Sequence, residues 1–198
     1  MIRIVAAVEA DIHRILEIER EAITPPWSRE ALFSEINRED SFFAVARGEH
    51  EPGNSEFGIR NSEFRIRGSE SRVQCTESGV QCVEQMLGCA DQPDAVIHGF
   101  VILRRIGDDG ELLQIAVDRV ARRHGIADLL MGAALRYVED NALDAVFLEV
   151  RSSNGAAIPL YKKHGFEFMH LRKDYYCEPV EDAVIMVRKH RNIFQFKL

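Results

Sequence analysis

Val117 to Leu130 reads V-D-R-V-A-R-R-H-G-I-A-D-L-L, and this stretch decides the fold. An apolar run from Leu112 to Val117 leads into it, which predicts a buried strand. A short polar turn follows, and apolar residues then return at helical spacing, at Ile126, Leu129, Leu130, Ala133, Ala134, Tyr137 and Val138. The stretch therefore predicts a strand, a tight turn and a helix in direct succession.

The turn between this strand and this helix has the composition of an anion site. Gly125 and Ala127 lie where backbone N–H groups must approach a ligand closely. The first N–H groups of a helix have no intrahelical acceptor, and the helix dipole is positive there. The alternative is an ordinary glycine turn with solvated arginines. The stretch lacks the G-x-G-x-x-G of dinucleotide-binding folds and the G-K-[ST] of nucleotide phosphate loops.

Length and composition set broad limits on the protein. The chain has 198 residues, of which 46% are hydrophobic, and we expect residues 1–198 to form one domain. The net charge of -7 disfavours nucleic acid and mildly favours basic or amine-bearing partners. No run is as long as an apolar membrane span, and Met1 to Val8 lacks the apolar core of a signal peptide. We therefore expect a cytoplasmic protein without membrane contact.

The cysteines and histidines are not spaced as metal ligands. The 4 cysteines include no C-x-x-C pair, and His98, His124, His164 and His170 are not paired with Cys, Asp or Glu at metal-ligand spacing. We expect neither a metal site nor a disulfide.

Short strands and helices alternate in the first half of the chain. A plausible helix N-cap is Ser28, and the helix after it would bury Leu32, Phe33 and Ile36. The single tryptophan, Trp27, either packs under the start of this helix or lines a substrate groove. The predicted elements are a strand over 2–5, helices over 8–23 and 29–37, and strands over 42–46 and 95–104.

A long connection separates the strands over 42–46 and 95–104. Adjacent strands are usually joined by a short loop, but here residues 48–94 intervene. From Asn54 to Pro93 a seven-residue unit, first seen as N-S-E-F-G-I-R, recurs in decaying copies. Its single apolar column supports neither a coiled coil nor an amphipathic strand. We predict that 48–94 is an irregular insert looped out of a hairpin, and that duplication explains the spacing of its three cysteines.

Ala145 to Val150 reads A-V-F-L-E-V and is apolar on both alternating faces except at Glu149. Such a strand is typically buried and central. A carboxylate in it is costly unless it is paired or functional. Arg151, on the same face, is the candidate partner, and a general base is the functional interpretation. Glu111 is the rival base, although it lies at the exposed end of its strand.

Leu148 to Phe166 reads L-E-V-R-S-S-N-G-A-A-I-P-L-Y-K-K-H-G-F, in which Asn154 can cap a helix that Gly165 ends. Together with the Arg122-Arg123-His124-Gly125-Ile126-Ala127 turn, it resembles the GNAT acetyltransferase superfamily, whose pyrophosphate loop is written [QR]-x-x-G-x-[GA]. The pattern is similar to the branch that acetylates the N-terminal alanine of a small-subunit ribosomal protein. The likeness covers most of the chain outside the insert.

The resemblance implies an α/β fold with a mixed central sheet flanked by helices, in which two parallel strands splay apart. The pantetheine arm of acetyl-coenzyme A would lie between the strand that ends near Val117 and the strand that ends near Val150. The implied cofactor contacts are Ile115, Ala116, Val117, Arg122, Arg123, His124, Gly125, Ile126, Ala127 and Asn154.

The resemblance also implies two catalytic roles. In that family the residue matching Glu149 is the general base, and the residue matching Tyr161 protonates the departing thiolate. An α-amine has a pKa of about 7.7 to 8.0, so a carboxylate suffices and no metal is required. Tyr161 is alternatively a core aromatic. Two departures stand out: Pro159 predicts a shifted or kinked helix before Tyr161, and Asp118 to Ala121 lacks the usual proline and aromatic residue.

The leading hypothesis is an enzyme that transfers an acetyl group from acetyl-coenzyme A to the N-terminal α-amine of a protein. A small-subunit ribosomal protein is the implied acceptor, and we expect a monomer or weak dimer. Trp27, Tyr175 and Tyr176 are candidate peptide contacts, although the tyrosines could equally pack. One alternative is the same fold acting on a small amine or a lysine side chain. The other is a non-catalytic module that binds coenzyme A.

Overall fold

The computed structural model describes residues 2–49 and 95–190 and builds them around one seven-stranded sheet. The strand order is β1-β2-β3-β4-β5-β7-β6, so the last two strands are exchanged relative to the chain. All neighbouring pairs are antiparallel except β4 and β5. The strands are β1 (Arg3–Ala6), β2 (Ser41–Glu49), β3 (Ala95–Ile106), β4 (Asp109–Val117), β5 (Ala145–Arg151), β6 (Glu167–Cys177) and β7 (Val180–Lys189).

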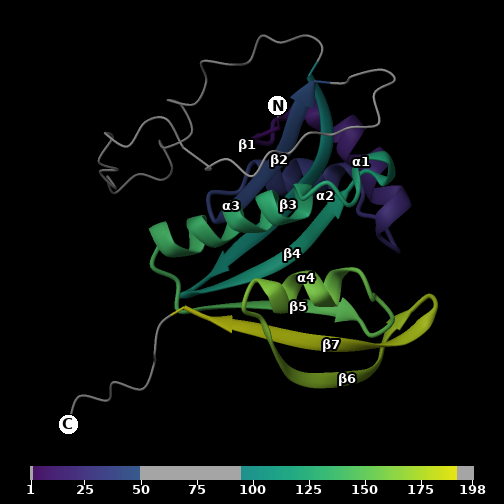
Figure 1. Cartoon of the computed structure of the whole chain (residues 1–198), viewed down its shortest axis with the longest axis vertical. Helices are drawn as coiled ribbons and strands as arrows, with labels where there is room; N and C mark the ends of the chain where they lie inside the picture. The colour runs from purple at the N-terminus through teal and green to yellow at the C-terminus, as the bar shows by residue number, and fades with distance from the viewer. Residues whose placement is uncertain (1, 50–94, 191–198) are drawn as a thin grey trace.

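Helices cover both faces of this sheet (Figure 1). One core holds the inner face of α3, with Leu130 and Ala134, and Tyr161 from α4. The other core lies beneath α1 and α2, with Ile15 and Leu32 at its centre. The helices are α1 (Ile12–Ala22), α2 (Arg29–Ile36), α3 (Ile126–Asp140) and α4 (Ala157–Lys163). None of the helices in this part of the chain is long and apolar enough to cross a bilayer.

The parallel pair at the centre of the sheet is joined along a short segment. Gly110 to Leu112 of β4 pair with Val146 to Leu148 of β5, and the register ends there. Each strand continues beyond that point, to Val117 and Arg151, and the two diverge (Figure 1). The splayed pair within a mixed sheet confirms the predicted fold class.

The second helix illustrates one correct and one wrong prediction. The Ser28 hydroxyl accepts a hydrogen bond from Ala31 N at 3.1 Å, which confirms the predicted cap. Phe33, however, is 44% exposed, so its predicted burial is wrong. Its place on the inner face is taken by Glu35, which is buried and paired with Arg104 of β3. Apolar periodicity could not predict this inner face, because one of its buried residues is charged.

The predicted hairpin around the insert is partly within the described residues. Glu49 at the end of β2 pairs with Ala95 at the start of β3, which confirms that these strands are neighbours. β2 includes Gly48, so the proposed insert begins two residues later than predicted. The seven-residue repeat, Asn54 to Pro93, lies outside the described residues.

We predict that replacing residues 50–94 with Asn-Gly preserves the fold, because this two-residue turn joins Glu49 to Ala95 in the observed register. Loop-closure entropy depends only logarithmically on length, so stability should change by about 1 to 2 kcal/mol at most. Thermal melting followed by circular dichroism measures this change. As a control, joining Gly48 to Ala95 through the same turn forces a one-residue register slip and should lower the melting temperature strongly. A loss of about 10 °C in the in-register variant would show that 50–94 contributes to packing.

Candidate active site

The turn before α3 has the backbone geometry of an anion site. Gly125 precedes the first residue of the helix and has a φ of 76°, and Arg123 has a φ of 67°. Both angles lie in the left-handed region, which glycine adopts without strain. The Arg122 Nε donates to the Val117 carbonyl oxygen at 3.0 Å, which fastens the turn to the end of β4. The first N–H groups of α3 therefore lie directly beyond the point where β4 leaves the sheet.

An acidic residue in the first turn of α3 is bound by two side chains at the end of α4. Asp128 Oδ1 contacts Lys163 Nζ at 2.7 Å and His164 Nε2 at 2.9 Å. Burial opposes the ionised form of Asp128, but these two bonds outweigh it and lower the pKa of that carboxyl group. The negative charge of Asp128 is thus held toward α4 rather than left free at the helix start. The turn and the helix N-terminus fit a pyrophosphate group.

The end of β4 is closely packed on the side of β3. A Cβ atom at Gly99 would lie 2.6 Å from the Ala116 carbonyl oxygen, so only glycine fits there. Ala116 faces the core beneath α1, whereas Ile115 and Val117 face the core beneath α3. On the other side β5 does not pair with these three residues. Their backbone on that side is available to a ligand in the splay.

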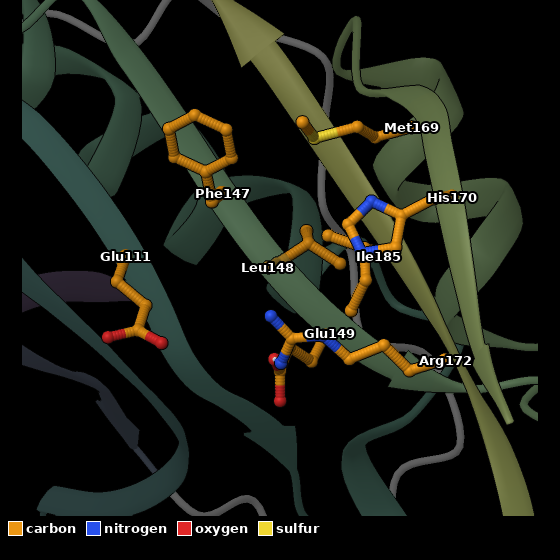
Figure 2. Close-up of a pocket in the computed structure, with 8 residues that line it drawn as sticks. All are labelled: Glu111, Phe147, Leu148, Glu149, Met169, His170, Arg172 and Ile185. Carbon is orange, nitrogen blue, oxygen red and sulfur yellow. Dashed lines mark hydrogen bonds and ion pairs between the residues drawn. The ribbon is translucent and has the colours of Figure 1, made fainter. Parts of the chain in front are cut away.

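Glu149 is held by β6 rather than by the partner expected from sequence. Its carboxylate forms an ion pair with Arg172 (Figure 2). A hydrogen bond to the same carboxylate raises the pKa of Tyr175. The Arg172 guanidinium lies 5.4 Å from the centre of the Tyr175 ring. The interpretation of Arg151 as the partner is wrong. Strand periodicity could not reveal the true pair, because Arg172 is in a strand that is distant in sequence.

Arg151 instead ties together the loops that flank the site. It donates to the Thr24 carbonyl oxygen at 3.1 Å, in the loop after α1, and to the Glu178 carbonyl oxygen at 2.9 Å, in the turn between β6 and β7. Its guanidinium stacks 4.1 Å from the centre of the Tyr176 ring. The predicted substrate residues Tyr175 and Tyr176 therefore lie beside Glu149, fixed by two arginines.

Tyr161 is buried on the opposite side of the sheet's central strands. It packs edge-on against Phe166 with ring centroids 5.9 Å apart, and it belongs to the core beneath α3. Burial, with a smaller contribution from Tyr176, raises the pKa of its phenol well above the ordinary value. The ring thus belongs to the core, and its burial favours the protonated form of the hydroxyl.

Asn154 and Pro159 shape the start of α4. Asn154 Oδ1 accepts from Ala157 N, the first residue of α4, at 3.0 Å, but the N-cap position is held by Ala156 and not, as predicted, by Asn154. Pro159 is the third residue of α4, and its missing N–H falls in the first turn of the helix. The segment from Ala157 to Lys163 is one continuous helix, so the predicted break before Tyr161 is not observed.

Trp27 lies apart from Glu149. It borders a hollow between α2 and Arg104, together with Ser34 and Arg38. Its backbone N–H donates to Glu19 Oε1 at 2.7 Å, and Gln114 Nε2 donates to the same oxygen at 2.8 Å. The sequence did not single out Glu19 or Gln114, since a glutamate among the charged residues of an amphipathic helix gives no signal of burial.

A cavity of about 240 Å³ opens beside Glu149 on the face of the sheet that carries α1 and α2 (Figure 2). Glu111, the rival base, lines the same cavity, and the remaining walls are largely apolar. The lining residues are Glu111, Phe147, Leu148, Glu149, Met169, His170, Arg172 and Ile185. Within residues 2–49 and 95–190, no three His, Cys, Asp or Glu side chains gather as metal ligands.

Comparison with known proteins bears on this arrangement. The model of the acetyltransferase (GNAT) family matches residues 65–166, just over half of the chain. The chain belongs to the GNAT acetyltransferase family.

Individual GNAT relatives agree with this placement. A [ribosomal protein bS18]-alanine N-acetyltransferase of Salmonella typhimurium is 36% identical over 95 residues, which are 47% of this chain and 64% of that protein. The chain thus matches less than two thirds of that relative's length. The crystal structure of the ribosomal-protein-S18-alanine N-acetyltransferase from Escherichia coli superposes with a TM-score of 0.67 at 22% identity, covering 100% of both chains. An N-acetyltransferase from Thermoplasma acidophilum, solved with coenzyme A, gives 0.61 at 18% identity, covering 96% of this chain and 99% of that one.

We predict that Gly125→Val weakens coenzyme A binding by at least about tenfold, because a β-branched residue is strained at this positive φ and its bulk displaces the converging N–H groups. Calorimetry with coenzyme A measures the affinity, and thermal melting shows whether the fold survives. Gly132→Val is the matched control, since it adds the same side chain to the same helix where no atom lies within 4 Å. Equal affinities for the two variants would contradict an anion site at this turn.

Proposed function

We propose that the protein transfers an acetyl group from acetyl-coenzyme A to the N-terminal α-amine of another protein, with the N-terminal alanine of a small-subunit ribosomal protein as the acceptor. The observation that carries this proposal is the position of Glu149. Its carboxylate lies in a cavity on one face of the sheet, next to the opening between β4 and β5. The name of the Salmonella relative supports the choice of acceptor.

Acetyl-coenzyme A would be held by backbone groups along β4 and the turn that follows it. Arg122, Arg123, His124, Gly125, Ile126 and Ala127 would bind the pyrophosphate, because the free N–H groups and the helix dipole meet there. Ile115, Ala116 and Val117 would offer the unpaired edge of β4 to the pantetheine arm. A backbone N–H of this edge would also stabilise the oxyanion of the tetrahedral intermediate. Asn154 keeps its amide NH₂ as a donor while its oxygen accepts from Ala157 N.

Glu149 would act as the general base. An α-amine has a pKa of about 7.7 to 8.0, so it needs to lose one proton and does so readily near neutral pH. A carboxylate within hydrogen-bond reach, directly or through one water, is sufficient for this transfer. Arg172 and Tyr175 fix the direction of the carboxylate over the cavity, which makes Arg172 a positioning residue.

Tyr161 would act as the acid. A thiolate leaving group has a pKa of about 8.5, and a nearby phenol that remains protonated can supply its proton. An ordinary phenol is already protonated at neutral pH, and burial, which raises the pKa of Tyr161 further, makes it a weaker acid that would donate only as negative charge develops on the sulfur. The side chain comes from the α3 and α4 side of the sheet, whereas Glu149 faces the cavity on the other side. The two groups would therefore approach the acetyl group from opposite faces of the opening.

Peptide binding would involve Tyr175 and Tyr176 beside Glu149, with Trp27 farther along the same face. Mass spectrometry of N-terminal peptides, from cells with and without the protein, tests the function directly. The expected result is the loss of acetylation from an alanine-led ribosomal protein in cells that lack it. Acetylation of an alanine-led peptide by the purified protein provides the matching test in vitro. Failure of both tests would overturn the proposal.

Glu149→Gln should lower kcat by about 10² or more, since removing a positioned general base typically costs this much. Steady-state acetylation of an alanine-led peptide measures kcat, and calorimetry with coenzyme A should show unchanged affinity. Glu21→Gln, an exposed residue of α1, is the matched control and should behave as the unmodified protein. A normal rate in Glu149→Gln combined with a lost rate in Glu111→Gln would assign the base to Glu111.

Tyr161→Phe should lower kcat by about tenfold or more, because it removes the hydroxyl proton and leaves the ring packed against Phe166. The effect should diminish with an acetyl thioester whose thiol has a lower pKa, since such a thiolate leaves without protonation. Tyr137→Phe is the matched control, as Tyr137 stacks on Phe42 within the same core. Equal rates for the two variants would leave Tyr161 with a packing role alone.

A further inference from the structure

Glu111 is the second carboxylate in the cavity, and its charge is not matched by a direct partner. It lies on β4 between Arg104 of β3 and Phe147 of β5 in the strand register. Among residues 2–49 and 95–190, no side chain forms a hydrogen bond or a close ion pair with it. The hydrogen bond to Glu35 and, to a lesser extent, the negative charge of Glu111 contribute to the raised pKa of Arg104. The Arg104 guanidinium is, however, hydrogen-bonded to both carboxylate oxygens of Glu35, with Nε to Oε1 at 3.1 Å. Glu111 is therefore available to a ligand in the cavity.

The two carboxylates of the cavity differ in this respect. Glu149 is paired with Arg172 and bonded to Tyr175. Figure 2 shows Arg172 reaching across to Glu149, while Glu111 stands on the far side of the cavity. The unmatched negative charge in this space thus belongs to Glu111.

The walls of the cavity suit the stem of a long cationic side chain. Phe147, Met169 and Ile185 present apolar surface between the two carboxylates and β6. Lysine and arginine bury their methylene stems against such surface and keep the charged head at a polar group. An acidic or short neutral side chain would gain little here, because it would leave Glu111 without a counter-charge.

Strand geometry places Glu111 within reach of an acceptor bound at Glu149. Glu111 lies opposite Phe147, and Glu149 is two residues further along β5. With strands about 4.8 Å apart and a rise of about 3.3 Å per residue, the two Cα atoms are separated by about 8 Å. An extended peptide covers this distance in two to three residues. A chain whose α-amine lies at Glu149 therefore brings the side chain of residue 2, 3 or 4 to Glu111.

We propose that Glu111 is a specificity-determining residue that receives a lysine or arginine side chain from position 2, 3 or 4 of the acceptor protein. This inference rests on the proposed function, because it takes the acceptor amine to lie at Glu149. It assigns the two carboxylates separate roles: Glu111 selects the acceptor by charge, and Glu149 takes the proton. The net charge of -7 also favours basic acceptors over acidic ones.

The test compares alanine-led peptides that carry lysine or norleucine at position 2, 3 or 4, which differ in the ammonium group alone. The unmodified protein should prefer lysine at one of these positions by about tenfold in kcat/KM, as for a partly desolvated charge pair. Glu111→Gln should reduce that preference to within about twofold, chiefly by lowering kcat/KM for the lysine peptide. Glu111→Lys should prefer glutamate over lysine at the same position. Glu21→Gln, far from the cavity in sequence and exposed, should keep the original preference.

Several outcomes would overturn the inference. They are an absent lysine preference in the unmodified protein, a preference that survives in Glu111→Gln, and an equal loss of turnover on lysine and norleucine peptides in Glu111→Gln. The last outcome would make Glu111 the base. If no peptide is acetylated, the proposed function fails, but calorimetric binding of the same peptides to the coenzyme A-loaded protein still measures the lysine preference. If the lysine peptide binds about ten times more tightly than the norleucine peptide, and this difference is lost in Glu111→Gln, the role of Glu111 in binding a cationic side chain is supported independently of catalysis.

Discussion

The short pairing between β4 and β5 is the constraint on which the site depends. Three residues of each strand pair, and the strands then separate although both continue. Unpaired backbone N–H and C=O groups in a sheet require other partners, so the opening is a site where a ligand's amide groups can complete the ladder. The same divergence directs β4 to the anion turn and leaves Glu149 of β5 facing the cavity on one side of the opening. A fully paired sheet would have no place for either reactant.

Polar side chains hold the opening where strand pairing cannot. On the β4 side, buried Glu19 binds both Gln114 and the backbone of Trp27, and Arg14 of α1 is paired with Asp118 at the strand end. On the β5 side, Arg151 joins the loop after α1 to the turn between β6 and β7. The links on the β4 side are buried or half-buried, so losing one partner there would leave the other without compensation, whereas the hydrogen bonds of Arg151 are exposed. These hydrogen bonds and this ion pair join elements on either side of the opening, which strand pairing does not hold together.

The sequence predicted the elements that have strong local signals. The strand, turn and helix around Gly125, the Ser28 cap, and the apolar β5 with its single carboxylate follow from local backbone and burial rules, and the structure bears out each of them. The partners of those residues could not be predicted in the same way. The pairing of Glu149 with Arg172 depends on the exchange of β6 and β7 in the sheet, and the burial of Glu35 depends on Arg104 across the core. Both contacts join elements that are distant in sequence, and local patterns in a single sequence do not predict such pairs.

The division of charge within the cavity has a chemical consequence. A base that faced the amine alone would stabilise the ammonium form and so oppose the deprotonation that the reaction needs. Arg172 beside Glu149 offsets that attraction, since an ammonium entering there meets a cation and an anion together. In the proposed arrangement, attraction for positive charge would be left to Glu111, about 8 Å away along the sheet by strand geometry, where it would act on a side chain rather than on the reacting nitrogen. Within residues 2–49 and 95–190, Glu149 has a cation in direct contact and Glu111 has none, so the proposed arrangement assigns reactivity and charge selection to separate carboxylates.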